Sequence, residues 1–120
     1  MPKKILIAED EASLSKALSL KLANLGFEVE LAEDGAQALS LLKSKSFDLM
    51  LLDLMMPKLD GFGVLAEKKD WKSKPVVFVS SNLSQQSDKT KALEAGADQF
   101  LVKSDVSLKE LVNKINEALS

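Results

Sequence analysis

Short runs of aliphatic residues alternate along the chain with stretches in which apolar residues recur every three or four positions. Strands joined by helices form right-handed βαβ units, which build a parallel sheet with helices on both faces. The alternation therefore predicts a doubly wound α/β domain, and 120 residues suffice for one such domain. We expect the five strands at Lys4–Ala8, Phe27–Leu31, Asp48–Leu52, Val76–Val79 and Phe100–Val102.

Five helical patterns lie between and after these runs. The first carries Leu14, Leu18, Leu22 and Leu25 at helical spacing, and Gly26 is placed to end the helix. The last begins with the capping box of Ser107 and Glu110 and continues as a one-sided apolar stripe. The other three are expected over residues 33–44, 62–69 and 85–96.

The composition excludes several classes of function. The chain has no cysteine and no histidine, which removes disulfides, thiol catalysis, the usual general base and the usual zinc ligands. A formal net charge of -2 argues against sequence-independent nucleic-acid binding, which needs a basic face. No apolar run reaches the length of a membrane span, and the first ten residues lack the pattern of a signal peptide. Any chemistry must use carboxylates, hydroxyls and lysines.

Residues of those kinds stand where the predicted strands end, which is where parallel sheets bind ligands. Glu9 and Asp10 follow the first strand, Asp53 the third, Ser80 the fourth and Lys103 the fifth. Acidic residues before a helix are also common as simple caps. Clustered carboxylates tolerate one another if a cation lies among them, and oxygen ligands favour Mg²⁺. A metal, a lysine and a hydroxyl together suit a phosphoryl group, which a carboxylate can accept as nucleophile.

Four segments resemble the motifs of response-regulator receiver domains of two-component signalling, in order and at matching spacing. They are "ILIAEDE", "DLMLLDLMMPKLDGFGVL", "PVVFVSS" and "ALEAGADQFLVKS". The resemblance covers essentially the whole chain and implies one receiver domain over residues 1–120, of the stand-alone type. It also implies the flavodoxin-like (βα)5 fold with strand order 2-1-3-4-5, and a cytoplasmic location.

The resemblance assigns a role to each of the strand-end residues. Asp53 matches the phosphoacceptor and Lys103 the lysine that pairs with the phosphoryl group. Asp10 matches a direct Mg²⁺ ligand, Glu9 a ligand acting through water, and the backbone carbonyl of Met55 the third protein ligand.

Two departures from the family pattern concern the switch. Ser104 follows Lys103 where the family usually has a proline after a cis bond, and a non-proline cis bond costs about 2.5–4 kcal/mol. The loop after the fourth strand has one extra residue compared with the family pattern. Counting forward from the fourth strand therefore selects Ser80, whereas counting back from Lys103 selects Ser81. We prefer Ser80 as the switch hydroxyl, because the loop should absorb an insertion. Phe100 matches the aromatic switch position.

The resemblance also implies the partners. A histidine kinase or histidine phosphotransfer protein would dock on the first helix and the strand-end loops. A downstream output protein would meet the fourth helix, fifth strand and fifth helix, with no direct nucleic-acid contact and no membrane insertion. The chain would be a monomer or a phosphorylation-dependent dimer.

Two other functions remain open from the sequence. A binding module could signal without phosphorylation. A phosphatase with an aspartyl nucleophile would need a general-acid aspartate two residues after Asp53, where this chain has Met55. Slow self-dephosphorylation remains possible, with Met55 and Asn82 flanking the path of the attacking water.

Overall fold

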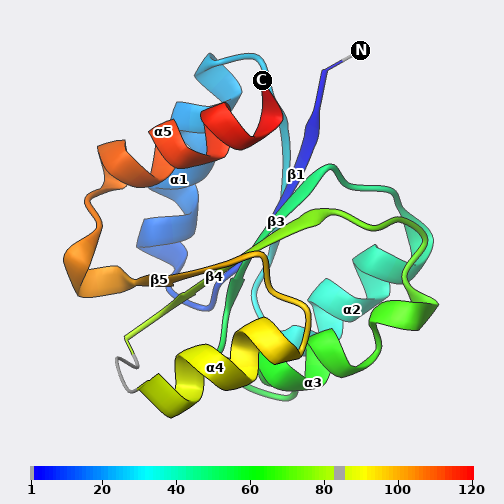
Figure 1. Cartoon of the computed structure of the whole chain (residues 1–120). Coiled ribbons are helices and arrows are strands. Elements are labelled where there is room, and N and C mark those ends of the chain that lie inside the picture. Colours follow the sequence, from blue (N-terminus) through cyan, green and yellow to red (C-terminus); the bar gives the residue numbers. More distant parts are fainter. Residues whose placement is uncertain (1, 83–85) are drawn as a thin grey trace.

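The computed structural model describes residues 2–82 and 86–120. Five parallel strands form one sheet in the order β2-β1-β3-β4-β5, so the predicted fold class and strand order are confirmed (Figure 1). The elements follow one another as β1 Lys4–Ala8, α1 Ala12–Asn24, β2 Glu28–Ala32, α2 Gly35–Ser44, β3 Leu49–Asp53, α3 Gly61–Ala66, η1 Lys68–Asp70, β4 Val76–Ser81, α4 Gln86–Glu94, β5 Gln99–Val102, η2 Lys103–Asp105 and α5 Leu108–Leu119.

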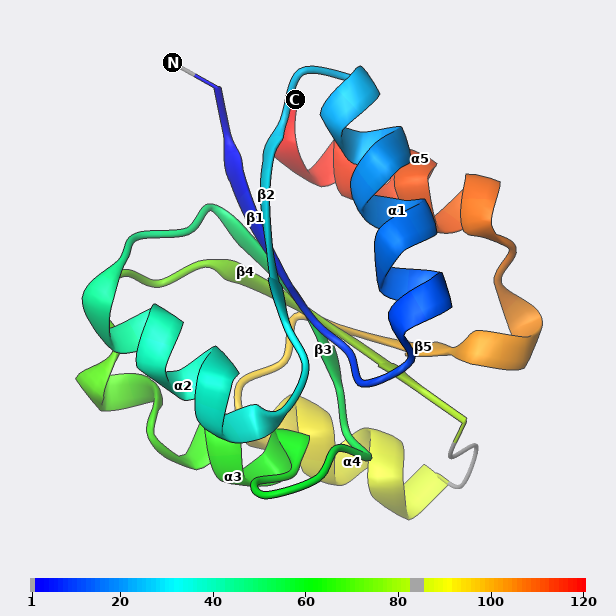
Figure 2. The ribbon, with the colours of Figure 1, turned by 180° about the vertical axis from the view of Figure 1, so that it is seen from behind.

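Helices cover both faces of the sheet. Helices α1 and α5 lie on one face, and α2, α3 and α4 lie on the other (Figures 1 and 2). Alternate residues of β3 enter opposite cores: Leu49 and Leu51 pack with α1 and α5, whereas Met50 and Leu52 pack with α2, α3 and α4. Burial on both faces explains why this strand is continuously apolar.

Strand β1 lies where predicted, and the other four strands differ from the predicted boundaries by one or two residues. Strand β2 lies one residue later than predicted, and β3 also lies one residue later, so that it includes Asp53. Strand β4 continues through Ser81, and β5 begins at Gln99. In β3, β4 and β5 the added residues are polar and still pair with a neighbouring strand, as Asp53 does with Ser80.

The helices occupy the predicted segments with somewhat different limits. Helix α2 begins later than predicted, at Gly35, and α4 ends earlier, at Glu94. Helix α3 begins one residue earlier than predicted, at Gly61, and ends at Ala66.

Leu25 was expected on the buried stripe of the first helix, but it follows the end of α1 and is 52% exposed. Gly26, at φ +94, ends this helix as predicted. The capping box of Ser107 and Glu110 is formed at α5. The predicted start of the fourth helix at residue 85 lies outside the described residues. Within the described ranges, no helix is long and apolar enough to cross a membrane.

Candidate functional site

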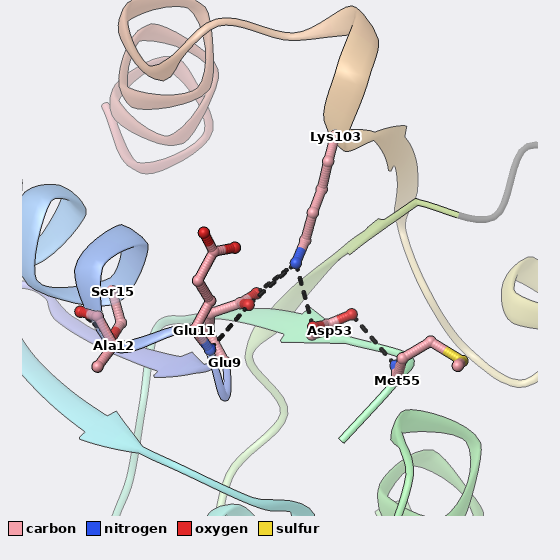
Figure 3. Close-up of polar contacts among 7 residues, drawn as sticks. All are labelled: Glu9, Glu11, Ala12, Ser15, Asp53, Met55 and Lys103. Carbon is pink, nitrogen blue, oxygen red and sulfur yellow. Dashed lines mark hydrogen bonds and ion pairs between the residues drawn. The ribbon is translucent and has the colours of Figure 1, made fainter. Parts of the chain in front are cut away.

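The carboxyl ends of the parallel strands bring the predicted site residues to one edge of the sheet. Glu9 follows the end of β1, Asp53 is the last residue of β3, and Lys103 follows the end of β5. Figure 3 shows the Lys103 side chain extending toward the carboxylates of Glu9 and Asp53. Residues separated by 94 and 50 positions in the sequence therefore contact one another.

Lys103 joins the two carboxylates. Its Nζ lies 2.9 Å from both carboxylate oxygens of Glu9 and 3.1 Å from Oδ2 of Asp53. The carboxylates are almost fully buried, and the lysine side chain is only 15% exposed. The resemblance assigns Lys103 to the phosphoryl group on Asp53, and the structure places it against Asp53 and also against Glu9.

Asp53 has hydrogen-bond partners for both of its oxygens. Oδ2 accepts from Lys103, and Oδ1 accepts from the backbone N–H of Met55 at 3.1 Å. A buried carboxylate without such partners would cost several kcal/mol. These contacts explain how the apolar third strand can end in a carboxylate that is 4% exposed.

Burial and pairing shift the pKa values at this edge. Burial opposes the positive charge of Lys103, but hydrogen bonds and attraction from Glu9 and Asp53 outweigh it and raise the pKa of Lys103. Burial raises the pKa of Glu9 above its ordinary value, and the negative charge of Asp53 acts in the same direction. Lys103 and the N–H of Glu11 oppose that rise without cancelling it. The site thus holds a firmly protonated lysine.

The carboxylates form a group that suits a divalent cation. Glu9, Asp10 and Asp53 each offer an oxygen, and these atoms lie within 4.8 Å of one another. Asp10 is exposed, so its carboxylate remains accessible from solvent. An all-oxygen set with one accessible carboxylate is the donor chemistry that Mg²⁺ takes, since it retains several waters. The residues present therefore fit a magnesium ion.

The strand register distinguishes the two candidate hydroxyls. Ser80 is the residue of β4 that pairs with Asp53 of β3. The residue before Asp53 and the residue before Ser80 each pack under α2, α3 and α4. Because side chains alternate between the two faces of a sheet, the side chains of Asp53 and Ser80 lie on the face covered by α1 and α5. Ser81 alternates to the face away from Asp53. The register supports Ser80, whose contact with a phosphoryl group stays a prediction.

The structure also shows the position of Phe100 and the peptide bond between Lys103 and Ser104. Phe100 is partly buried and packs against the core under α2, α3 and α4, as a core residue would. Its switching role is not tested by this arrangement. No cis peptide bond occurs in the described part of the chain, so Lys103 is joined to Ser104 by a trans bond. Lys103 nevertheless contacts Asp53, so the missing proline does not displace the ammonium group.

A cleft of about 640 Å³ adjoins the acidic edge and contains residues that the sequence does not single out. Glu9 and Asp10 line it together with Lys16, Asp34 and Lys58. Lys58 Nζ lies 3.6 Å from Oδ2 of Asp34, across two loops. No local pattern predicts this pair, because its members are 24 positions apart and belong to connections between elements.

Comparisons with known proteins agree with this geometry. The family model of the response regulator receiver domain matches residues 5–116. The probable transcriptional regulator ycf27 of Porphyridium aerugineum is 43% identical over 116 residues, which are 97% of this chain and 48% of that protein. The chain therefore spans about half the length of the curated relatives that it matches.

Solved structures match over nearly the entire chain. A CheY-like receiver domain protein of Methanospirillum hungatei has a TM-score of 0.90 at 26% identity, covering 99% of this chain and 94% of that one. A second match is to the co-crystal structure of the Saccharomyces cerevisiae histidine phosphotransfer signaling protein Ypd1 and the receiver domain of its downstream response regulator Ssk1. It has a TM-score of 0.85 at 26% identity and covers 97% and 88% of the two chains. The chain belongs to the receiver domains of response regulators, which are signalling switches and not classical enzymes.

Proposed function

We propose that Asp53 accepts a phosphoryl group from a histidine kinase or a histidine phosphotransfer protein, in a reaction that depends on Mg²⁺. The observation that carries this proposal is the position of Lys103 Nζ, 3.1 Å from Oδ2 of Asp53, beside two further carboxylates at the strand-end edge. A lysine held there stabilises negative charge on an incoming phosphoryl group.

The proposed transfer uses Asp53 as the nucleophile. A carboxylate oxygen of Asp53 forms a bond to phosphorus while the bond from phosphorus to the donor imidazole nitrogen breaks. The backbone N–H of Met55 holds Oδ1 at 3.1 Å and thereby fixes the orientation of the carboxylate. Lys103, which already contacts Oδ2, then forms an ion pair with the oxygens of the transferred group.

Asp10, Asp53 and the backbone carbonyl of Met55 are the proposed Mg²⁺ ligands, with Glu9 acting through water. When bound, the ion supplies charge neutralisation for the phosphoryl oxygens. The three carboxylates and one lysine of the site leave an excess of acidic groups, which a divalent cation would offset. Glu9, whose oxygens both contact Lys103, orients that lysine toward Asp53.

We further propose that phosphorylation shifts a conformational equilibrium. Ser80 would donate a hydrogen bond to the new phosphoryl group, and Phe100, which packs under α4, would change position with the loop after β4. The altered surface of α4, β5 and α5 would then control a partner protein. In this proposal, the charge added at one edge of the sheet shifts the equilibrium between two conformations of the domain.

The proposed donor class is supported by one structural neighbour. That neighbour is a co-crystal structure of a histidine phosphotransfer protein and a receiver domain. We propose the same class of phosphodonor for this chain, docking near α1 and the strand-end loops. The same proposal includes a downstream partner protein, a monomer or a phosphorylation-dependent dimer, a cytoplasmic location and one domain over residues 1–120.

The deciding experiment is intact mass spectrometry after incubation with Mg²⁺ and acetyl phosphate. We expect one phosphoryl adduct in the wild-type chain and none in Asp53→Asn. Asp60→Asn is the matched control, because Asp60 is an exposed aspartate that caps α3 and Asn retains a capping oxygen. Absence of an adduct in the wild type, or its persistence in Asp53→Asn, would contradict the assignment and favour signalling without phosphorylation.

The same adduct measures self-dephosphorylation. After removal of acetyl phosphate, we propose that the adduct decays slowly, because Met55 and Asn82 are exposed and lack an acid or base to activate water. Decay over time is read from the same mass spectra, and loss of the adduct within seconds would contradict this part of the proposal.

A further inference from the structure

We infer that Asp34 and Lys58 form a positioning pair that sets the loop of residues 54–60, and through it the affinity of the site for Mg²⁺. The inference rests on the proposed function, because this loop carries the carbonyl of Met55 that we assign to the metal. Neither residue touches Asp53, so both would act through the loop.

The backbone of Lys58 has an unfavourable conformation that calls for a compensating contact. In the described part of the chain, it is the one residue other than glycine with a positive φ, at 69°. This left-handed region favours glycine or asparagine over a long side chain. A lysine at this position therefore points to a role for its ammonium group.

The ammonium group has a specific partner on the neighbouring loop. Lys58 Nζ lies 3.6 Å from Oδ2 of Asp34, whose side chain is 8% exposed. The other oxygen, Oδ1, accepts from the backbone N–H of Gln37 at 2.8 Å and caps α2. The hydrogen bond from Gln37 and the charge of Lys58 hold the pKa of Asp34 below its ordinary value, against the effect of burial. Asp34 is thus a charged anchor fixed to the start of α2.

The loop also rests directly on α2 beside this ion pair. A Cβ atom added to Gly35 would clash with the backbone carbonyl of Leu59, so backbone lies against backbone there. Within the loop, the N–H of Leu59 donates to the carbonyl of Pro57 at 2.8 Å. The loop is therefore held at α2 by Lys58 and Leu59, and at Asp53 by Met55.

The geometry links this support to the acidic site. Met55 lies three residues before Lys58, and Lys58 lines the same cleft as Glu9 and Asp10. If Lys58 no longer contacted Asp34, the loop could move, and the Met55 carbonyl would leave the position in which it can bind the metal.

The sign of the effect separates loop positioning from simple electrostatics. Loss of a positive charge near an acidic cation site would strengthen Mg²⁺ binding by Coulomb attraction alone. Loss of loop positioning would weaken it. We expect Lys58→Met to bind Mg²⁺ roughly two- to fivefold more weakly, the range set by an exposed ion pair. Lys58→Arg should retain most of the affinity.

The experiment is isothermal titration of Mg²⁺ into the metal-free protein. Lys16→Met is the matched control, because Lys16 is an exposed lysine of the same cleft that belongs to α1. It should bind Mg²⁺ as tightly as the wild type or more tightly. Asp34→Asn retains the capping oxygen, and combined with Lys58→Met it should weaken binding no further than Lys58→Met alone.

Amide hydrogen exchange in the metal-free protein gives a second readout. We expect faster exchange at Met55 and Leu59 in Lys58→Met than in the wild type. Unchanged or tighter Mg²⁺ binding by Lys58→Met, alongside much weaker binding by Asp10→Ala, would overturn this inference and leave the proposed function intact. A wild-type chain without saturable Mg²⁺ binding would overturn both.

Discussion

At the scale of single residues, the site is organised by charge compensation. Asp53 and Glu9 are each 4% exposed, and one lysine contacts both of them. A buried ion pair is weak evidence for stability, because desolvation offsets much of the attraction. The arrangement is better explained by the proposed function, in which Asp53 is the nucleophile and lies next to a fixed positive charge.

Asp34 gives a pH dependence with a defined sign. Its pKa is lowered in the fold, chiefly by the backbone hydrogen bond from Gln37, so the unfolded chain binds the proton more readily. The stability that its charge contributes is therefore present above its ordinary pKa of 3.8 and is lost as the pH falls through the lower, folded pKa. Replacing Asp34 should therefore change the free energy of unfolding at neutral pH and not in strong acid.

We expect the difference in unfolding free energy between the wild type and Asp34→Asn to be constant above about pH 5 and to shrink below it. Urea unfolding of both proteins at successive pH values measures this difference. Asp60→Asn, which also replaces a helix-capping aspartate, is the control. A difference that grows in acid would show that the sign is wrong.

At the scale of elements, the five strands are predictable because short apolar runs alternate with helical patterns along the chain. Their ends are less predictable, since Asp53 and Gln99 are polar and still pair within the sheet. Leu25 shows the opposite case: it is apolar but exposed, because the helix ends before it and Gly26 redirects the chain. Pairing and chain direction, which depend on the whole fold, decide these positions.

In the site, too, some features are predictable from the sequence and others depend on the whole fold. Glu9 and Lys103 are predictable as site residues because each directly follows a strand of a parallel sheet. The contact between them is not predictable from spacing, since it depends on how far the Lys103 side chain reaches across the sheet. Asp34 and Lys58 follow no strand-end rule at the acidic edge, and their contact depends on the path of two loops.

Helix α4 is joined to α3 by a contact that can be tested. Lys91 Nζ lies 4.8 Å from the centroid of the Phe62 ring, and Lys68 Nζ donates to the carbonyl of Gly96 at 3.2 Å, just after α4. We expect Lys91→Met to lower the free energy of unfolding by about 0.5–1 kcal/mol, because the cation leaves the ring face.

Urea unfolding monitored by circular dichroism measures that loss. Lys89→Met, at an exposed lysine of the same helix, should change the free energy by less than about 0.5 kcal/mol. Equal effects of the two substitutions would show that the aromatic contact contributes nothing. Because α4 belongs to the proposed output surface, this contact would also oppose its displacement.

At the scale of the whole molecule, one sheet separates two cores and carries the acidic site at its edge. Strand β3 contributes to both cores and ends in Asp53, so the site is built on the most buried element of the fold. A ligand that binds this edge in the folded state, and not in the unfolded chain, must stabilise the entire domain. Mg²⁺ should therefore be visible in global unfolding.

We expect Mg²⁺ at ten times its dissociation constant to add about 1.4 kcal/mol to the free energy of unfolding. For a domain of this size, that gain corresponds to a rise in Tm of about 4–8 °C. Thermal unfolding followed by circular dichroism, with NaCl at matched ionic strength as the control, measures the shift. Asp10→Ala should lose most of it, because Asp10 is the accessible carboxylate of the cluster. An equal rise in Asp10→Ala would mean that the ion stabilises the fold from another place, and the acidic edge would no longer be its site.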